Sequence, residues 1–183
     1  RQHEDANFYK SFAYLIVDNR NNPNFAQTGM KLDAVFAYFL NSNAENFENH
    51  TQLKARIESN FAVNNFLSFR FTANFGTFFN ANISNLQKYA LGGYVEQNFM
   101  NYNIMTVGTG IQAKILRNHY FNLFANVGNV ENELKALQFL KYQYIGYGIA
   151  YGYDSPFGPI NGFWTYSPQT EKGLFNISLG FWF

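Results

Sequence analysis

The sequence predicts an all-β fold, an antiparallel up-and-down transmembrane β-barrel of the outer-membrane type, and three observations predict it. Apolar and polar residues alternate with a period of two over runs of about ten residues, the length that a tilted strand needs to cross a bilayer. Short turns alternate along the chain with long connections, as they do between the two rims of such a barrel. Aromatic residues make up 20% of the chain and charged residues only 14%, yet no apolar stretch approaches the roughly 20 residues of a membrane helix.

Nine alternating runs are expected to form strands, and no linker between them suggests a domain boundary, so residues 1–183 are expected to be one barrel domain. A soluble β-sandwich would show the same alternation, but its strands are commonly only about five or six residues long. The last run is the clearest, because large apolar side chains occupy every second position of it. The nine runs lie near residues 8–17, 30–40, 53–61, 67–76, 105–114, 121–127, 144–153, 160–167 and 175–183.

Two turns fix the expected pairing of neighbouring strands. Ser155-Pro156-Phe157-Gly158 has Pro and Gly at the positions that suit a tight turn, and it pairs Tyr153 with Ile160 so that both face outward. We expect this turn on the periplasmic rim. At residues 64–66 a two-residue turn would pair an outward residue with an inward one, so we expect a three-residue turn that pairs Val63 with Leu67.

That register places charged side chains inside the barrel. Glu58 then faces Thr72 and lies diagonal to Arg70, with Arg56 beside it on the same strand. We expect Arg56, Glu58 and Arg70 to form a charge cluster in the lumen. Polar lining of the lumen is the simpler interpretation, because barrel interiors are polar by default, and a conduction or gating site is the alternative.

The sequence offers no catalytic chemistry of its own. It has no cysteine, and its three histidines (His3, His50 and His119) lie far apart with no carboxylate at ligand spacing, so no metal site is expected. It has no G-x-S-x-G nucleophile elbow, and its glycines alternate within strands, which indicates close packing in a narrow lumen. With a net charge of +1 there is no basic field for nucleic acid. No catalytic residue, cofactor or nucleic-acid partner is predicted.

Two stretches near the C-terminus resemble a known family. "GYGIAYGYDSPFGPI" (146–160) and "GLFNISLGFWF" (173–183) are similar to the end of the bacterial surface-antigen barrel superfamily, which includes barrel-assembly proteins and two-partner secretion transporters. The closing strand looks most like those of barrels fused behind patatin-like phospholipase domains in Bacteroidota. In the family this strand is the assembly signal, which implies that role here for Gly173, Phe175, Ile177, Leu179, Phe181 and Phe183.

A second part of the resemblance lies in the long connection at residues 80–102. The family carries an inward loop near Leu-Gly-Gly, followed by Arg-Gly-aromatic and five more strands. This chain has Leu91, Gly92 and Gly93 and then five expected strands, but it reads Gln97, Asn98 and Phe99 where the Arg-Gly-aromatic motif is expected. The lumen contact that this arginine makes in the family is therefore not expected in this chain. This difference favours a barrel that serves as an anchor or as a modified conduit.

The resemblance implies an outer-membrane location in a Gram-negative bacterium. It also implies that the chain is the C-terminal portion of a barrel, about nine of sixteen strands, and that the remaining N-terminal strands or domain belong to the same protein. The partners implied are outer-membrane lipid and the barrel-assembly machinery. Three functions stay open: anchor or export unit of a patatin-like lipid hydrolase, protein insertion or translocation factor, and autonomous small barrel acting as a pore, adhesin or ligand binder.

The alternation of the last strand makes a test of which face meets lipid. We expect Leu179→Arg to cost about 2–4 kcal/mol of stability, because this side chain faces the bilayer near mid-strand, whereas Ser178→Arg faces the wet lumen and should cost far less. The measurement is the free energy of unfolding of each variant in lipid vesicles. A larger cost at Ser178 would mean that the assignment of the two faces is reversed.

Overall fold

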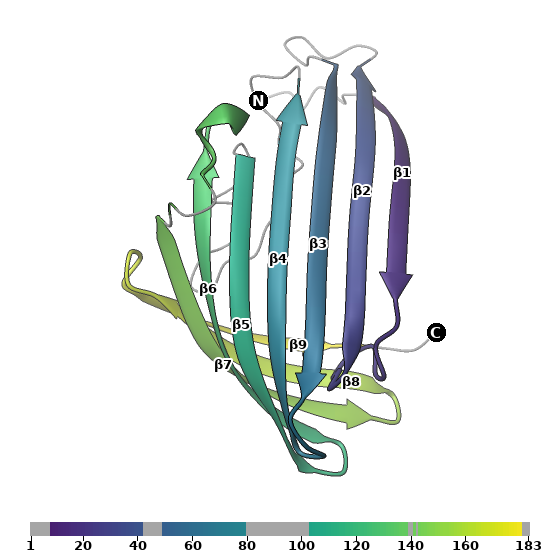
Figure 1. The fold of residues 1–183 in the computed structure, drawn as a ribbon, viewed down its shortest axis with the longest axis vertical. Helices are drawn as coiled ribbons and strands as arrows, with labels where there is room; N and C mark the ends of the chain where they lie inside the picture. Colours follow the sequence, from purple (N-terminus) through teal and green to yellow (C-terminus); the bar gives the residue numbers. More distant parts are fainter. Residues whose placement is uncertain (1–7, 42–48, 80–102, 139–140, 142, 181–183) are drawn as a thin grey trace, which may run out of the picture.

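The computed structural model describes residues 8–41, 49–79, 103–138, 141 and 143–180. Within these residues nine strands form one sheet in which each strand pairs antiparallel with the next along the chain (Figure 1). The predicted all-β, antiparallel up-and-down fold is confirmed. The strands are β1 (Phe8–Asp18), β2 (Gly29–Asn41), β3 (His50–Ala62), β4 (Leu67–Phe79), β5 (Asn103–Leu116), β6 (His119–Glu131), β7 (Tyr144–Ser155), β8 (Gly158–Ser167) and β9 (Lys172–Leu179), with one 3₁₀ turn, η2 (Leu134–Ala136), between β6 and β7.

The expected turns have the expected register. Ser155 pairs with Gly158 and Tyr153 with Ile160 in the β7–β8 ladder. In the turn between β3 and β4, the backbone N–H of Val63 donates to the carbonyl of Leu67 at 2.9 Å. This is the predicted three-residue turn, which pairs outward-facing residues with outward-facing ones. A shift of one residue would move every side chain of a strand to the other face.

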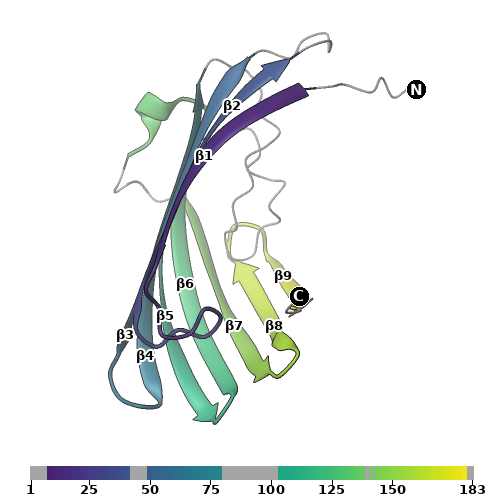
Figure 2. The same cartoon turned by 90° about the vertical axis from the view of Figure 1, so that its right-hand side faces the viewer.

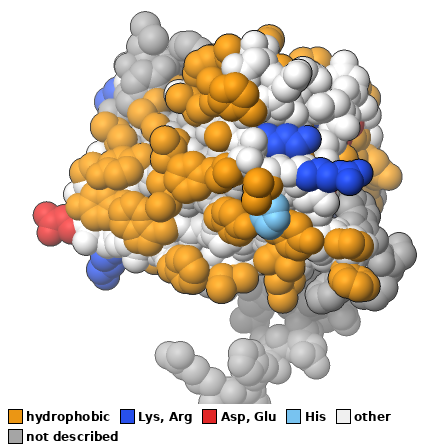
Figure 3. Space-filling model, turned by 90° about the horizontal axis from the view of Figure 1, so that it is seen from below, with side chains coloured by type: hydrophobic (Ala, Val, Ile, Leu, Met, Phe, Trp, Pro, Cys, Tyr) orange, Lys and Arg blue, Asp and Glu red, His pale blue; other side chains and the backbone are white. Residues whose placement is uncertain are grey.

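The sheet is strongly curved (Figure 2). Its two faces differ in chemistry. Large apolar side chains on the convex face are exposed to the surroundings, whereas polar side chains and glycines lie on the concave face. Seen from the end where the short turns lie, hydrophobic side chains cover much of the surface and charged ones appear at few places (Figure 3). The exposed convex set includes Ile57, Phe61, Phe69, Phe71, Leu123, Ile145, Tyr147, Ile149, Tyr151, Trp164, Phe175, Ile177 and Leu179.

The sheet does not close on itself within the described residues. Its order runs from β1 to β9, and no ladder joins these two strands to each other. In this part of the chain the outer edges of β1 and β9 therefore have no strand partner. The described residues also include no helix that is long and apolar enough to cross a membrane.

Glycines on the concave face let side chains and backbone from neighbouring strands approach closely. A Cβ on Gly148 of β7 would lie 2.7 Å from Cζ of Phe124 and closer still to the carbonyl oxygen of Trp164. A Cβ on Gly152 would overlap the ring of Phe25, and one on Gly108 would lie 2.7 Å from Oγ1 of Thr72. The alternate glycines of β5 and β7 thus mark close packing, as the sequence indicates.

Two glycines in neighbouring strands give a matched test of this packing. We expect Gly148→Ala to cost about 1–3 kcal/mol of the free energy of unfolding, because the nearest obstacle is backbone that cannot move aside. Gly162→Ala should be neutral or slightly stabilising, since a Cβ there meets nothing within 4 Å. Urea unfolding of both variants in lipid vesicles checks the difference, and equal costs would contradict the packing described.

Candidate functional site

The concave face carries a cluster of charged side chains centred on Glu58 of β3. Glu58 is only 6% exposed, and its carboxylate lies 3.3 Å from Arg20, 3.3 Å from Arg56 and 3.8 Å from Arg70. The Asn60 side chain donates a further hydrogen bond to Oε1 at 3.1 Å. A buried carboxylate is costly unless it is paired and hydrogen-bonded, and these four groups satisfy it.

Sequence reasoning placed three members of this cluster and missed the fourth. Glu58 lies opposite Thr72, as expected, and Arg70 is its diagonal neighbour. The missed residue is Arg20, which comes from the connection between β1 and β2 and so could not be placed by strand register. Arg20 joins the cluster only because the β1–β2 connection folds inward. The alternation of apolar and polar residues describes strands and does not predict the path of a connection.

Arg20 is held on two sides. Its Nη2 lies 2.7 Å from Oδ2 of Asp18, and its Nη1 faces Glu58. The hydrogen bond that Arg20 donates to Asp18 raises the pKa of the Arg20 guanidinium above its usual range, and the charge of Glu58 acts in the same direction.

A chain of hydrogen bonds leads from this cluster across the sheet. Arg70 Nη2 donates to Gln112 Oε1 at 3.2 Å. The Gln112 amide nitrogen donates in turn to the backbone carbonyls of Phe25 and Ala26, at 3.3 and 3.1 Å. Gln112 is fully buried, so the cluster and the β1–β2 connection form one continuous network.

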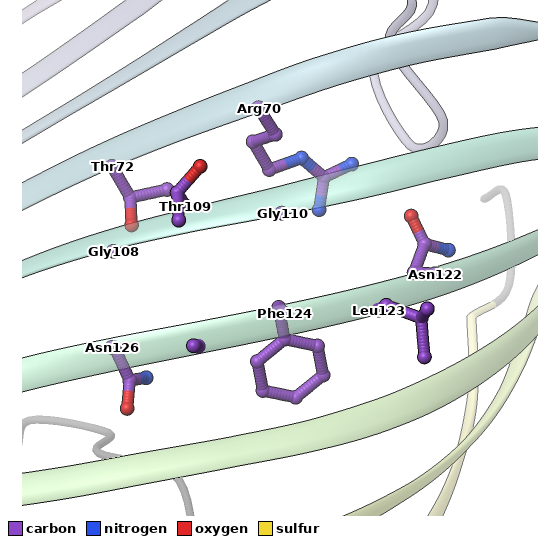
Figure 4. A pocket seen from close by; sticks show the side chains of 10 residues that line it. Arg70, Thr72, Gly108, Thr109, Gly110, Asn122, Leu123, Phe124 and Asn126 are labelled. Atoms are coloured by element: carbon purple, nitrogen blue, oxygen red, sulfur yellow. The ribbon is translucent and has the colours of Figure 1, made fainter.

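Beside the cluster lies a hollow of about 200 Å³ over β4, β5 and β6. Figure 4 shows Arg70 extending from β4 over Gly110 of β5, with the side chains of Asn122 and Asn126 on either side of Phe124 along β6. The lining offers amides, a guanidinium and an aromatic ring. Thr72 and Thr109 add hydroxyl groups to this lining.

The other predicted site residues lie at the rims and in β9. The turn of Ser155–Gly158 joins β7 and β8 at the same end as the turn at residues 64–66 (Figure 1). Of the expected assembly signal, Gly173, Phe175, Ile177 and Leu179 lie in β9 and are exposed. Its role stays a prediction. Phe181 and Phe183, and the inward loop residues Leu91, Gly92, Gly93, Gln97, Asn98 and Phe99, lie outside the described residues.

Comparison with known proteins agrees with this architecture. The sequence model of the OMP85 superfamily matches residues 1–183. The chain belongs to the OMP85 superfamily. It resembles the crystal structure of BamA from Haemophilus ducreyi lacking POTRA domains 1–3, with a TM-score of 0.69 and 13% sequence identity. The match covers 94% of this chain and 42% of that one, so the chain spans less than half the length of the structure it resembles. A search of curated proteins found no match.

Membership of the superfamily and the fold together identify the chain as an outer-membrane barrel of the OMP85 type. The convex apolar face is then the lipid face, and the concave face is the wall of the lumen. In the described part of this OMP85 barrel, no group of three or more His, Cys, Asp or Glu residues could hold a metal ion. The charge network, the hollow beside it and the β1–β2 connection are features of this lumen wall.

The charge of Glu58 is expected to hold the network together. Glu58→Gln keeps the size of the side chain but leaves three guanidinium groups facing one another, and we expect it to cost about 2 kcal/mol of the free energy of unfolding. The cost is lower than that of breaking a fully buried pair because Arg56 is half exposed to the lumen.

Asp33→Asn is the matched control for this change. Asp33 pairs with Lys31 at 3.0 Å on the same face, with both side chains about a third exposed, and its loss should cost less than about 1 kcal/mol. Urea unfolding in lipid vesicles compares the two variants. Equal costs would mean that Glu58 is an ordinary polar residue of the lumen wall and not the centre of the charge network.

Proposed function

We propose that this chain is the barrel domain that anchors, or helps to export, a patatin-like lipid hydrolase in the outer membrane of a Gram-negative bacterium of the Bacteroidota. The observation that carries the proposal is the resemblance of residues 146–160 and 173–183 to the barrels fused behind such hydrolases. Catalysis belongs to a domain that precedes this chain in the same protein.

The structure supports an anchor by what its two faces offer. The convex face presents a broad apolar surface to lipid, and burying each large side chain in hydrocarbon contributes roughly 1.5–3 kcal/mol. The hollow on the lumen wall offers amides, hydroxyls, a guanidinium and an aromatic ring. A barrel of this kind holds a partner domain at the membrane while the chemistry occurs elsewhere.

The proposed partners follow from the edges of the sheet. β1 and β9 have no strand partner at their outer edges in the described part of the chain, and hydrocarbon cannot satisfy the backbone groups there. We place the remaining N-terminal strands of the same protein against these edges. The barrel-assembly machinery is the proposed partner of β9 during insertion, through Phe175, Ile177 and Leu179.

The full-length protein tests this function. Its sequence ahead of this chain should contain a G-x-S-x-G elbow between a strand and a helix, and Ser→Ala there should abolish phospholipid hydrolysis by the outer-membrane fraction. The barrel should still insert, as judged by its heat-modifiable migration on a gel. A full-length sequence without the elbow, or hydrolysis that stays with the membrane after the substitution, would contradict the proposal.

A protein insertion or translocation factor is the second candidate, because the superfamily is shared with barrel-assembly and secretion proteins. It predicts that depletion of the protein lowers the levels of other outer-membrane barrels, and normal levels would exclude it. An autonomous small barrel fits less well, since the described β1 and β9 do not pair to close one.

A further inference from the structure

The connection between β1 and β2, residues 19–28, folds into the barrel instead of turning tightly at the rim. The neighbouring turns at the same end, residues 64–66 and 156–157, join their strands with few residues. Figure 2 shows the β1–β2 connection on the concave side, reaching from its own strands toward β7 and β8. We call residues 19–28 the inner loop.

An aromatic contact fixes the middle of the inner loop to the opposite wall. Phe25 is 3% exposed, and its ring stacks on that of Tyr120 of β6 with centroids 4.4 Å apart and planes 2° from parallel. The same ring rests against Gly152 of β7, where any side chain would overlap it. A large apolar side chain is thus sequestered within a polar lumen, which holds the loop against the wall.

Polar contacts hold the backbone on either side of this ring. The Phe25 and Ala26 carbonyls are the acceptors of the buried Gln112 amide described above. Asn22 Nδ2 donates to Asp154 Oδ2 of β7 at 3.0 Å. At the base of the loop, Arg20 is bound to Glu58 of β3, so the inner loop is attached to four different strands of the wall.

The inner loop also has an internal framework. The side-chain oxygen of Asn22 accepts from the backbone N–H groups of Asn24 and Phe25, each at 2.8 Å. Asn21 accepts in the same way from Gln27 and Thr28. Such side-chain to backbone bonds fix a turn in place of secondary structure, so the segment crosses the concave face as a defined body.

We propose that the inner loop is a plug that closes the turn-side mouth of the lumen to solutes. Four attachments hold it: the Phe25 ring on Tyr120 and Gly152, the Gln112 amide on the Phe25 and Ala26 carbonyls, the hydrogen bond from Asn22 to Asp154, and the salt bridge from Arg20 to Glu58. A simple hairpin would need only two or three residues here, and the additional ones are placed across the lumen with their buried carbonyls bound. The plug is independent of which domain precedes the barrel.

Shortening the inner loop in the full-length protein tests the plug. Residues 22–27 are replaced by Asn-Gly, which suits a two-residue hairpin turn and keeps the backbone bond from Asn21 to Thr28 (3.1 Å). In liposome swelling assays we expect the influx of a small uncharged sugar to rise about tenfold, because an unplugged polar lumen fills with water. Phe157→Ala, at an exposed turn of the same rim, should leave the influx unchanged. A folded shortened variant with unchanged influx would overturn the proposal.

A second variant decides the matter if the shortened protein does not fold. Phe25→Ala with Glu58→Gln removes the ring contact and the salt bridge. Asn22→Cys with Asp154→Cys replaces the hydrogen bond between these side chains by a reversible tether in a chain that has no cysteine. The variant with all four substitutions should leak in reductant and seal on oxidation, with the disulfide seen as altered migration on a gel. A leak that persists after the disulfide has formed would show that the inner loop does not close the lumen.

Discussion

The structure depends on one constraint: hydrocarbon offers no hydrogen bonds, so every backbone N–H and C=O in the membrane must find its partner in another strand. The eight ladders from β1 to β9 meet this requirement inside the described sheet. The period-two alternation follows from it, because a strand that is paired on both sides has only two faces left, one for lipid and one for the lumen. In the described sheet, the outer edges of β1 and β9 are the two places where this requirement is not met by a neighbouring strand.

The lumen face is subject to a different constraint, because side chains on the concave side of a curved sheet must pack in little space. Small residues at alternate positions of β5 and β7 let Phe124 and Phe25 come close to neighbouring backbone. Where the wall is not glycine it is polar, and its charges are joined in a network instead of scattered. Glu58 shares its two oxygens among three arginines, and that network continues through Gln112 to the inner loop. The wall and the loop are therefore one cooperative unit.

This arrangement separates the two jobs of the barrel. The apolar convex face and the ladders determine that the chain stays in the membrane, and neither depends on what fills the lumen. The charge network and the inner loop determine how open the interior is, and they are built from side chains that contribute nothing to the lipid face. Substitutions on the concave face can therefore change passage through the barrel without changing its residence in the membrane.

The sequence by itself determined the strands, their faces and the register of two hairpins, β3–β4 and β7–β8. Alternation determined which residues face lipid. A strand has only two faces, and a slip of one residue exchanges them. The need to pair outward residues with outward ones therefore determined the turn at residues 64–66, and this turn placed Glu58 diagonal to Arg70. Only the tertiary structure decided the path of residues 19–28. That segment follows no period, and its position depends on contacts with Gln112, Tyr120 and Asp154, which lie far away in the sequence. The curvature of the sheet brings these residues close to residues 19–28, and the local sequence pattern does not predict that curvature.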